Sequence, residues 1–285
     1  MSENRAPAWV VPVMRTGYSA RGGTYIVLGI LTLLAAWTGQ EAEGTKEALE
    51  KLRSVPFGYA ALWGLSVGLM AYCIWRLIDA AMDLEDYGSG AKGVVARGGQ
   101  VITGLIHAGL SISAARLAMG RGNGEGDSAQ SAASWVLQQP YGKVLIMIVG
   151  AVVICTGAYY AWKGIDEKYK EHVRQTRWAL KLDPVIKAGL VAHGLVIALI
   201  GVFLIYAGLN SDPSQAGGIG KAFQTVRSQP YGQALLAALA VGMLGFAVYC
   251  FVEAVYRVLP ARNGGDVKTL ATHARMKAER LAHGH

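Results

Sequence analysis

The chain has 285 residues, of which 53% are apolar and only 16% are charged, and its formal net charge at pH 7 is +8. A soluble domain carries roughly 25% charged residues, so this composition argues against a soluble globular protein. It also argues against a nucleic-acid-binding protein, because no soluble unit gathers the basic residues into one surface. The three cysteines (Cys73, Cys155 and Cys250) lie in apolar stretches, which is typical of packing residues.

Six apolar stretches dominate the chain. Each holds about 18 or more residues, enough for an α-helix to cross a hydrocarbon core of about 30 Å. We therefore predict six transmembrane helices, over residues 18–39, 56–81, 95–117, 140–165, 185–209 and 230–257. The first is expected to act as an uncleaved start-transfer segment, since no cleavage pattern precedes it.

The connections predict an orientation. Most of the 27 Lys and Arg residues lie before the first helix, in the second and fourth connections, and after the last helix. By the positive-inside rule, both termini are then cytoplasmic, and the basic face is expected to contact anionic lipid headgroups. The connection 118–130 is expected to be flexible, the connection 166–184 to continue the fourth helix, and the tail 258–285 to form a cytoplasmic surface helix.

One unit is written three times. Gln229-Pro230-Tyr231-Gly232 opens the sixth apolar stretch, Gln139-Pro140-Tyr141-Gly142 the fourth and Val55-Pro56-Phe57-Gly58 the second. An amphipathic segment precedes each phrase, over residues 40–55, 131–139 and 217–229. We expect the proline to start the helix, the aromatic ring to lie at headgroup level and the glycine to admit a neighbouring helix.

The repeat predicts the fold class. We expect an all-α, polytopic membrane protein whose six helices form three parallel two-helix repeats around a pseudo-threefold axis, with short amphipathic segments on the outer surface. The repeats cover about 15–84, 92–168 and 184–257 within one membrane domain of residues 1–285. Pairs of small residues predict close helix contacts, namely Gly64 and Gly68, Gly150 and Gly157, and Gly194 and Gly201.

These phrases resemble a known family. Gly17-Tyr18-Ser19-Ala20-Arg21-Gly22 and the three Pro-containing phrases, in a threefold array of helix pairs, are similar to the bacterial membrane family called domain of unknown function 1206. The resemblance covers about Arg15 to Arg257. It departs in the third repeat, where His193 replaces the arginine, and in the first, where Val55 and Phe57 replace Gln and Tyr. The resemblance implies a bacterial inner (plasma) membrane protein and no particular activity.

His107 is the strongest single candidate for a functional residue. It falls near the middle of the third predicted helix, where ionisable groups are costly. It shares one helix face with Gln100, Thr103 and Ser111, because these residues are spaced three or four apart. We interpret this stripe as a candidate ligand-binding or pore-lining surface. The alternative is a neutral histidine that is hydrogen-bonded to Thr103, to a neighbouring helix or to buried water.

Ionisable residues also recur at one position in every helix. We interpret them as residues at the cytoplasmic helix ends that snorkel to the interface and form ion pairs that fix the bundle, with Arg21–Asp79 and His193–Glu253 as the candidate pairs. The alternative is a charge ring at a cytoplasmic gate. The predicted ring consists of Arg21, Arg97, His193, Asp79, Lys163 and Glu253.

Three functions remain open from the sequence. The first is a transporter or channel for a small solute or ion, the second a structural, lipid-binding or accessory membrane protein, and the third a redox protein that binds a cofactor through His107. We do not expect an enzyme, because no nucleophile–base pair or paired carboxylates share one depth, and we expect no metal or cofactor. A homo-oligomer is compatible with the sequence.

Overall fold

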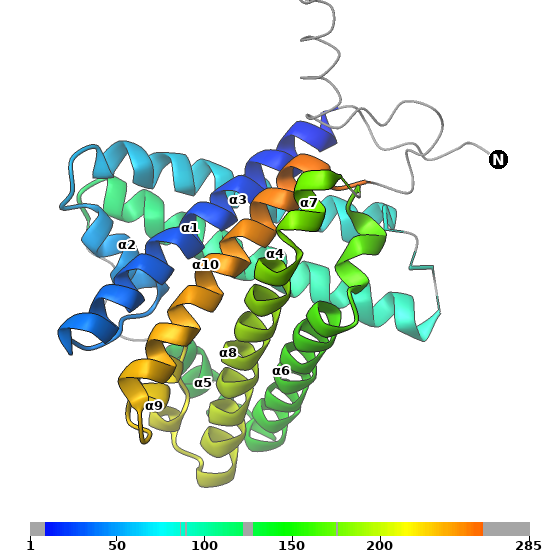
Figure 1. The fold of residues 1–285 in the computed structure, drawn as a ribbon. Coiled ribbons are helices and arrows are strands. Elements are labelled where there is room, and N and C mark those ends of the chain that lie inside the picture. The colour runs from blue at the N-terminus through cyan, green and yellow to red at the C-terminus, as the bar shows by residue number, and fades with distance from the viewer. Residues whose placement is uncertain (1–8, 86, 89, 122–127, 175, 259–285) are drawn as a thin grey trace, which may run out of the picture.

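The computed structural model describes residues 9–85, 87–88, 90–121, 128–174 and 176–258 (Figure 1). The predicted tail helix and residues 122–127 of the predicted flexible connection lie outside this part. Six helices are long and apolar enough to cross a membrane, and the described residues form no named strand, so the all-α prediction is confirmed. These helices are α1 (Val10–Thr38), α3 (Gly58–Met82), α4 (Ala91–Ala118), α6 (Gly142–Ile165), α8 (Asp183–Asn210) and α10 (Gly232–Tyr256).

The first helix begins earlier than predicted. We expected it to start near residue 18, but α1 begins at Val10. Pro12 does not prevent this, because a proline in the first turn removes no intrahelical hydrogen bond. Arg21 therefore lies about 16 Å along the helix from Val10, at about 1.5 Å per residue. The prediction that it lies near the helix end, close to water, is wrong.

As predicted, a short helix precedes the second transmembrane helix of each repeat. These are α2 (Thr45–Leu52), α5 (Ser128–Leu137) and α9 (Ile219–Arg227). Each places an alanine under its apolar face, and Ala48, Ala133 and Ala222 are at most 2% exposed. The segment just before α2 lies against α9, because Gln224 of α9 donates to the carbonyl of Ala42 at 3.1 Å.

A tight turn joins each short helix to the long helix that follows. The amide of Gly58 donates to Val55 at 2.9 Å, and the same bond recurs at Gly142 and Gly232. The residue before each glycine has a positive φ of 61° or 62°, as in a type II turn with proline at its second position. The prolines thus precede the helices by two residues. The prediction that they open the helices is wrong, because the turn uses their fixed φ instead.

The fourth connection does not continue the fourth helix. α6 ends at Ile165, and the chain then forms the 3-10 turn η1 (Lys168–His172) and the short helix α7 (Arg177–Lys181). An isolated antiparallel bridge joins Val173 of this connection to Arg257. The connection between α8 and α9 contains the 3-10 turn η2 (Pro213–Gln215). The fourth connection therefore folds back onto the end of α10.

The long helices are neighbours in the order α4, α3, α1, α10, α8 and α6. Figure 1 shows α1, α10, α8 and α6 side by side, with α3 and α4 behind them. A closed ring of six helices with pseudo-threefold symmetry, as predicted, has six neighbour pairs, and this order supplies five of them. The sixth pair, α4 with α6 within the second repeat, shares no comparable interface. The ring is therefore open on one side.

Glycines bring the backbones of α6 and α8 close together. A Cβ atom added to Gly157 would lie 2.5 Å from the carbonyl oxygen of Gly194, and one added to Gly150 would lie 2.8 Å from that of Gly201. Such an approach is possible only without side chains, which is the usual basis of tight helix pairs in membranes. The predicted glycine pairs of α6 and α8 therefore face each other.

Candidate functional site

Arg21 lies at the centre of the bundle. Its side chain is 3% exposed, although α1 is a membrane-spanning helix. The guanidinium donates to the Tyr72 hydroxyl of α3 at 3.0 Å and lies 4.9 Å from the ring centroid of Phe246 in α10. The rings of Tyr25 and Tyr72 are also within cation–π range. Among the described residues, no carboxylate forms an ion pair with Arg21.

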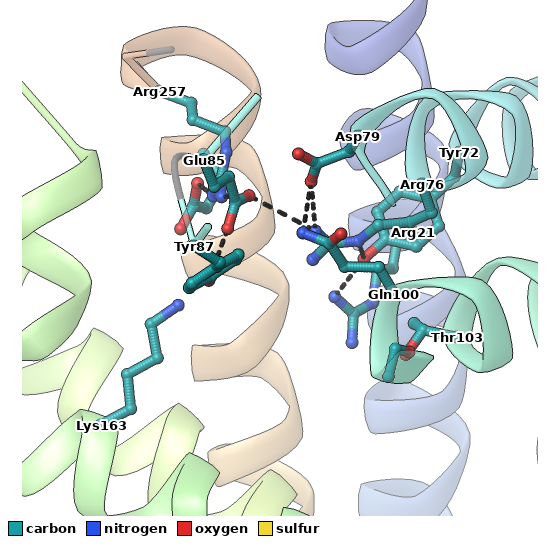
Figure 2. A network of polar contacts seen from close by, with 12 residues as sticks. Arg21, Tyr72, Arg76, Asp79, Glu85, Tyr87, Gln100, Thr103, Lys163 and Arg257 are labelled. Atoms are coloured by element: carbon teal, nitrogen blue, oxygen red, sulfur yellow. Dashed lines mark hydrogen bonds and ion pairs between the residues drawn. The ribbon is translucent and has the colours of Figure 1, made fainter. Parts of the chain in front are cut away.

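A second arginine connects α3 to its carboxylates. Arg76 donates through Nε to the Tyr72 hydroxyl at 3.0 Å and through Nη1 to Asp79 at 3.2 Å (Figure 2). The same nitrogen lies 3.5 Å from Glu85. Gln100 of α4 donates to Asp79 at 2.8 Å, which ties α4 to this cluster. Asp79 is fully buried, so each of these contacts offsets the cost of removing its charge from water.

A third arginine holds two acids at the end of α10. Arg257 forms ion pairs with both Glu253 and Glu85, and all three side chains are less than 10% exposed. Burial opposes ionisation of Glu85, but Arg257 and Arg76 hold the pKa of this carboxyl below its ordinary value. Tyr87 adds a hydrogen bond to Glu85 at 2.7 Å. The chain after Met82 is thereby fixed to the end of α10.

Lys163 reaches into this cluster from α6. Its ammonium donates to the Tyr249 hydroxyl of α10 at 3.0 Å and lies 5.5 Å from the Tyr249 ring centroid. Figure 2 shows its side chain directed toward Tyr87 and Glu85. We call the ionisable groups of this region the central network. Its cations are Arg21, Arg76, Lys163 and Arg257, and its acids are Asp79, Glu85 and Glu253.

The predicted polar stripe of α4 faces α3. Ser111 donates to the carbonyl of Ser66 at 2.7 Å, and Ser66 donates back to that of Ser111 at 3.0 Å. His107 is 6% exposed, shares a hydrogen bond of 2.8 Å with the Thr103 carbonyl, and lies 4.5 Å from the Tyr72 ring. Thr103 itself bonds the carbonyl of Gly99. In this structure, the stripe joins two helices, which is a common use of polar residues in membranes.

The predicted charge ring is divided between several environments. Asp79, Lys163 and Glu253 belong to the central network, as does Arg21. His193 is stacked on Phe246 at 3.8 Å between ring centroids and contacts the rings of Tyr25 and Tyr160.

Arg97 lies apart from the other predicted ring residues. It donates to the carbonyls of Ala80 and Ala81 at the end of α3. A cation is favoured there by the helix dipole. Arg97 therefore stabilises a helix end and takes no part in the central network.

The two predicted ion pairs do not form. Arg21 bonds Tyr72 instead of Asp79, and Glu253 pairs with Arg257 instead of His193. The cause is that both carboxylates pair with arginines three or four residues away along the chain, Asp79 with Arg76 and Glu253 with Arg257. Sequence reasoning missed Tyr72, Arg76, Glu85 and Arg257. One signal was present, since Arg76 is a charge within the second predicted helix, and such a residue is expected to face a partner.

No cluster of three or more His, Cys, Asp or Glu side chains suited to a metal ion occurs in the part of the chain that the structure describes. The two candidate histidines are instead surrounded by rings and a backbone carbonyl. His193 keeps an Nδ1 atom without a hydrogen-bond partner. Both histidines thus pack against aromatic rings in this structure.

The fold and the network define a multi-pass, all-helical membrane protein with ionisable groups buried between its helices. The family model described as Domain of Unknown Function (DUF1206) matches residues 16–83, 98–166 and 188–257. The chain belongs to this family, and its three repeats are confirmed. It is 28% identical over 253 residues to the uncharacterized protein YxxB of Bacillus subtilis (strain 168), covering 87% of this chain and 92% of that protein. No solved structure gives a significant match.

Proposed function

We propose that this protein is a non-catalytic transporter of a small anionic solute, which binds at the central network. The observation that carries the proposal is Arg21, a buried cation within a membrane-spanning helix that pairs with no described carboxylate. Ionisable residues inside a membrane protein are costly and commonly mark a substrate pathway.

The charge balance of the central network favours an anion. Four cations face three carboxylates, and both Asp79 and Glu253 already bond an arginine. Among the described residues, Lys163 forms no ion pair with a carboxylate and donates to the Tyr249 hydroxyl, as Arg21 donates to that of Tyr72. A bound anion would supply the missing negative charge near Arg21 and Lys163. An arginine also presents several donors in one plane, which suits carboxylates and phosphates.

We further propose that the protein lies in the bacterial inner membrane with both termini in the cytoplasm. The even number of candidate spanning helices supports this proposal, because six crossings would return residues 9 and 258 to the same side of the membrane. The basic connections favour the cytoplasm for that side. The central network then lies in the cytoplasmic half of the bundle, near the ends of α3, α6 and α10.

The experiment is an uptake assay with the full-length protein in liposomes. The uptake of radiolabelled phosphate and of radiolabelled chloride is compared between vesicles that contain the protein and protein-free vesicles. The two arginines of the repeat supply a matched pair of variants, since Arg21 lies in the network and Arg97 donates to the carbonyls at the end of α3. We expect Arg21→Gln to reduce uptake at least roughly tenfold, because hydrogen bonds to charged groups contribute about 1.5–3 kcal/mol. Arg97→Gln should transport normally.

The proposal fails if both variants transport at the parental rate. Gel filtration and a melting curve of each variant separate a loss of transport from a loss of folding. Arg21→Lys provides a further check, because it keeps the charge and loses the planar donor group. Partial uptake by this variant would support an electrostatic role for Arg21.

A second candidate function is a lipid-binding scaffold without transport. The observation that favours it is an open groove of about 460 Å³ between α1 and α3. Its walls are mostly apolar or small and include Val27, Leu52 and Leu65, and it lies along two membrane-spanning helices. Such a groove suits an acyl chain. Retention of lipid together with an absence of uptake for every anion would favour the scaffold.

A further inference from the structure

The open side of the ring, between α4 and α6, has a sequence cause. In the first repeat, a Cβ atom added to Gly68 of α3 would lie 2.3 Å from that of Ala20 in α1. In the third repeat, one added to Gly242 of α10 would lie 2.3 Å from that of Ala192 in α8. The same position of the second repeat carries Val152, which excludes this close packing. We call the gap that results the α4–α6 seam.

Both walls of the seam are uncovered. Val152 is 53% exposed, and Ile148 and Tyr159 on the same face of α6 are 56% and 49% exposed. On α4, Ile106 is 58% exposed, and a Cβ atom added to Gly99 would meet nothing within 4 Å. In the other two repeats, the positions equivalent to Val152 and Tyr159 are buried, namely Gly68 and Trp75 in α3, and Gly242 and Tyr249 in α10. The seam thus opens the bundle sideways, toward the hydrocarbon of the bilayer.

The α6 wall of the seam changes from apolar to basic along its length. One helix face carries four residues at spacings of four, seven and four, namely Ile148, Val152, Tyr159 and Lys163. Lys163 lies at the last position of this face and belongs to the central network, which also contains Arg21. A ligand that matches both parts has an acyl chain and an anionic headgroup. Basic pockets between helices on the cytoplasmic side are a known form of acidic-lipid site.

We infer that the α4–α6 seam binds an acidic phospholipid of the surrounding bilayer, with its phosphate at Lys163 and Arg21 and an acyl chain along α6. This inference rests on the proposed function, because Arg21 binds the anion in both. It adds the source of the anion and its route, which is sideways from the membrane. The same charge balance that favours a free anion favours this headgroup, and the apolar wall adds the acyl chain.

The test is native mass spectrometry of the full-length protein released from detergent with either phosphatidylglycerol or phosphatidylcholine of equal chain length. The parent should retain phosphatidylglycerol in preference. Lys163→Gln should lower the retained fraction roughly fivefold, as expected for one basic residue at an anionic headgroup. Val152→Trp should lower it by filling the seam.

Two control variants lie on exposed sites away from the seam face. Lys143→Gln removes a lysine at the opposite end of α6, and Val241→Trp adds the same bulk to an exposed site on α10, where Val241 is 57% exposed. Both should retain phosphatidylglycerol like the parent. Equal retention of the two lipids, or equal loss in the seam and control variants, would overturn the inference.

Inorganic phosphate distinguishes a free anion from a lipid. If phosphate raises the melting temperature of the parent but not of Lys163→Gln, while no lipid is retained, the seam inference is wrong and the proposed anion transporter stands. If neither phosphate nor phosphatidylglycerol binds and Arg21→Gln transports normally, both proposals fail. Melting curves of the four variants show that each one is folded.

Discussion

Arg257 offers the most demanding test of the central network. The change Arg257→Met removes a guanidinium that is 5% exposed and keeps much of its volume. It leaves Glu253, which is fully buried, with its Oε2 atom deprived of Arg257 and its Oε1 atom without a hydrogen-bond partner among the described residues. Glu85 loses less, because it keeps Arg76 at 3.5 Å and Tyr87 at 2.7 Å.

The magnitude follows from these contacts. Breaking one side of a buried ion pair costs about 3–5 kcal/mol, since the remaining charge stays uncompensated. We assign most of this cost to Glu253. The double variant Arg257→Met with Glu253→Gln should therefore recover about half of the loss, because the stranded charge is gone. Arg97→Met, which loses only bonds to carbonyls, should cost less than about 1 kcal/mol.

The assay is reversible unfolding in mixed detergent micelles with increasing dodecyl sulfate, followed by circular dichroism. The parent, both Arg257 variants and Arg97→Met are compared at pH 7. A loss below about 1 kcal/mol for Arg257→Met, or no recovery in the double variant, would refute the assignment of Arg257 as the partner of two buried acids.

Three other predictions concern packing, turns and pH. Gly157→Ala should destabilise the α6–α8 contact by about 2–3 kcal/mol, because its Cβ would lie 2.5 Å from a backbone oxygen, whereas Gly109→Ala in open space should cost nothing in the same unfolding assay. Gly232→Ala should lower the free energy of unfolding by at least as much, since its Cβ would lie 1.8 Å from the Arg227 carbonyl oxygen. Tyr231→Gly, which relieves a positive φ, should not lower the melting temperature. The pKa of Glu85 is below its ordinary value of 4.5 in the fold, so its contribution is complete above pH 4.5 and declines as the pH falls toward the lowered value. Unfolding measured between pH 6 and pH 3 should show this decline in the parent, and a parental slope in Glu85→Gln would contradict it.

The sequence predicts the helices and the repeat well because both have local causes. Uncharged stretches of sufficient length specify spanning helices, and the recurring Pro-aromatic-Gly phrase specifies the turn before each. The start of α1 at Val10 was missed, since a proline and a charged residue precede the apolar stretch. The pairing of charges was also missed, because it depends on which helices are neighbours and how they rotate.

The open ring illustrates what the sequence left hidden. Val152 stands where the other repeats have glycine, and this difference is readable once the repeats are aligned. Its consequence is not readable, because a valine in a membrane helix is ordinary unless the close contact at that position is known. The same holds for His107, whose stripe predicted a polar surface but not that α3 covers it.

The attachment of α6 to the bundle through α8 also bears on how the protein is made. During synthesis α6 enters the membrane before α8, and about 45 further residues must be added before α8 is complete, which takes several seconds at roughly 5–20 residues per second. In that interval, Gly150 and Gly157 have no partner helix and face lipid or the insertion machinery. The second repeat therefore depends on the third repeat for the partner of its α6, and a nascent chain halted before α8 would expose the unpaired glycine face of α6 within the membrane.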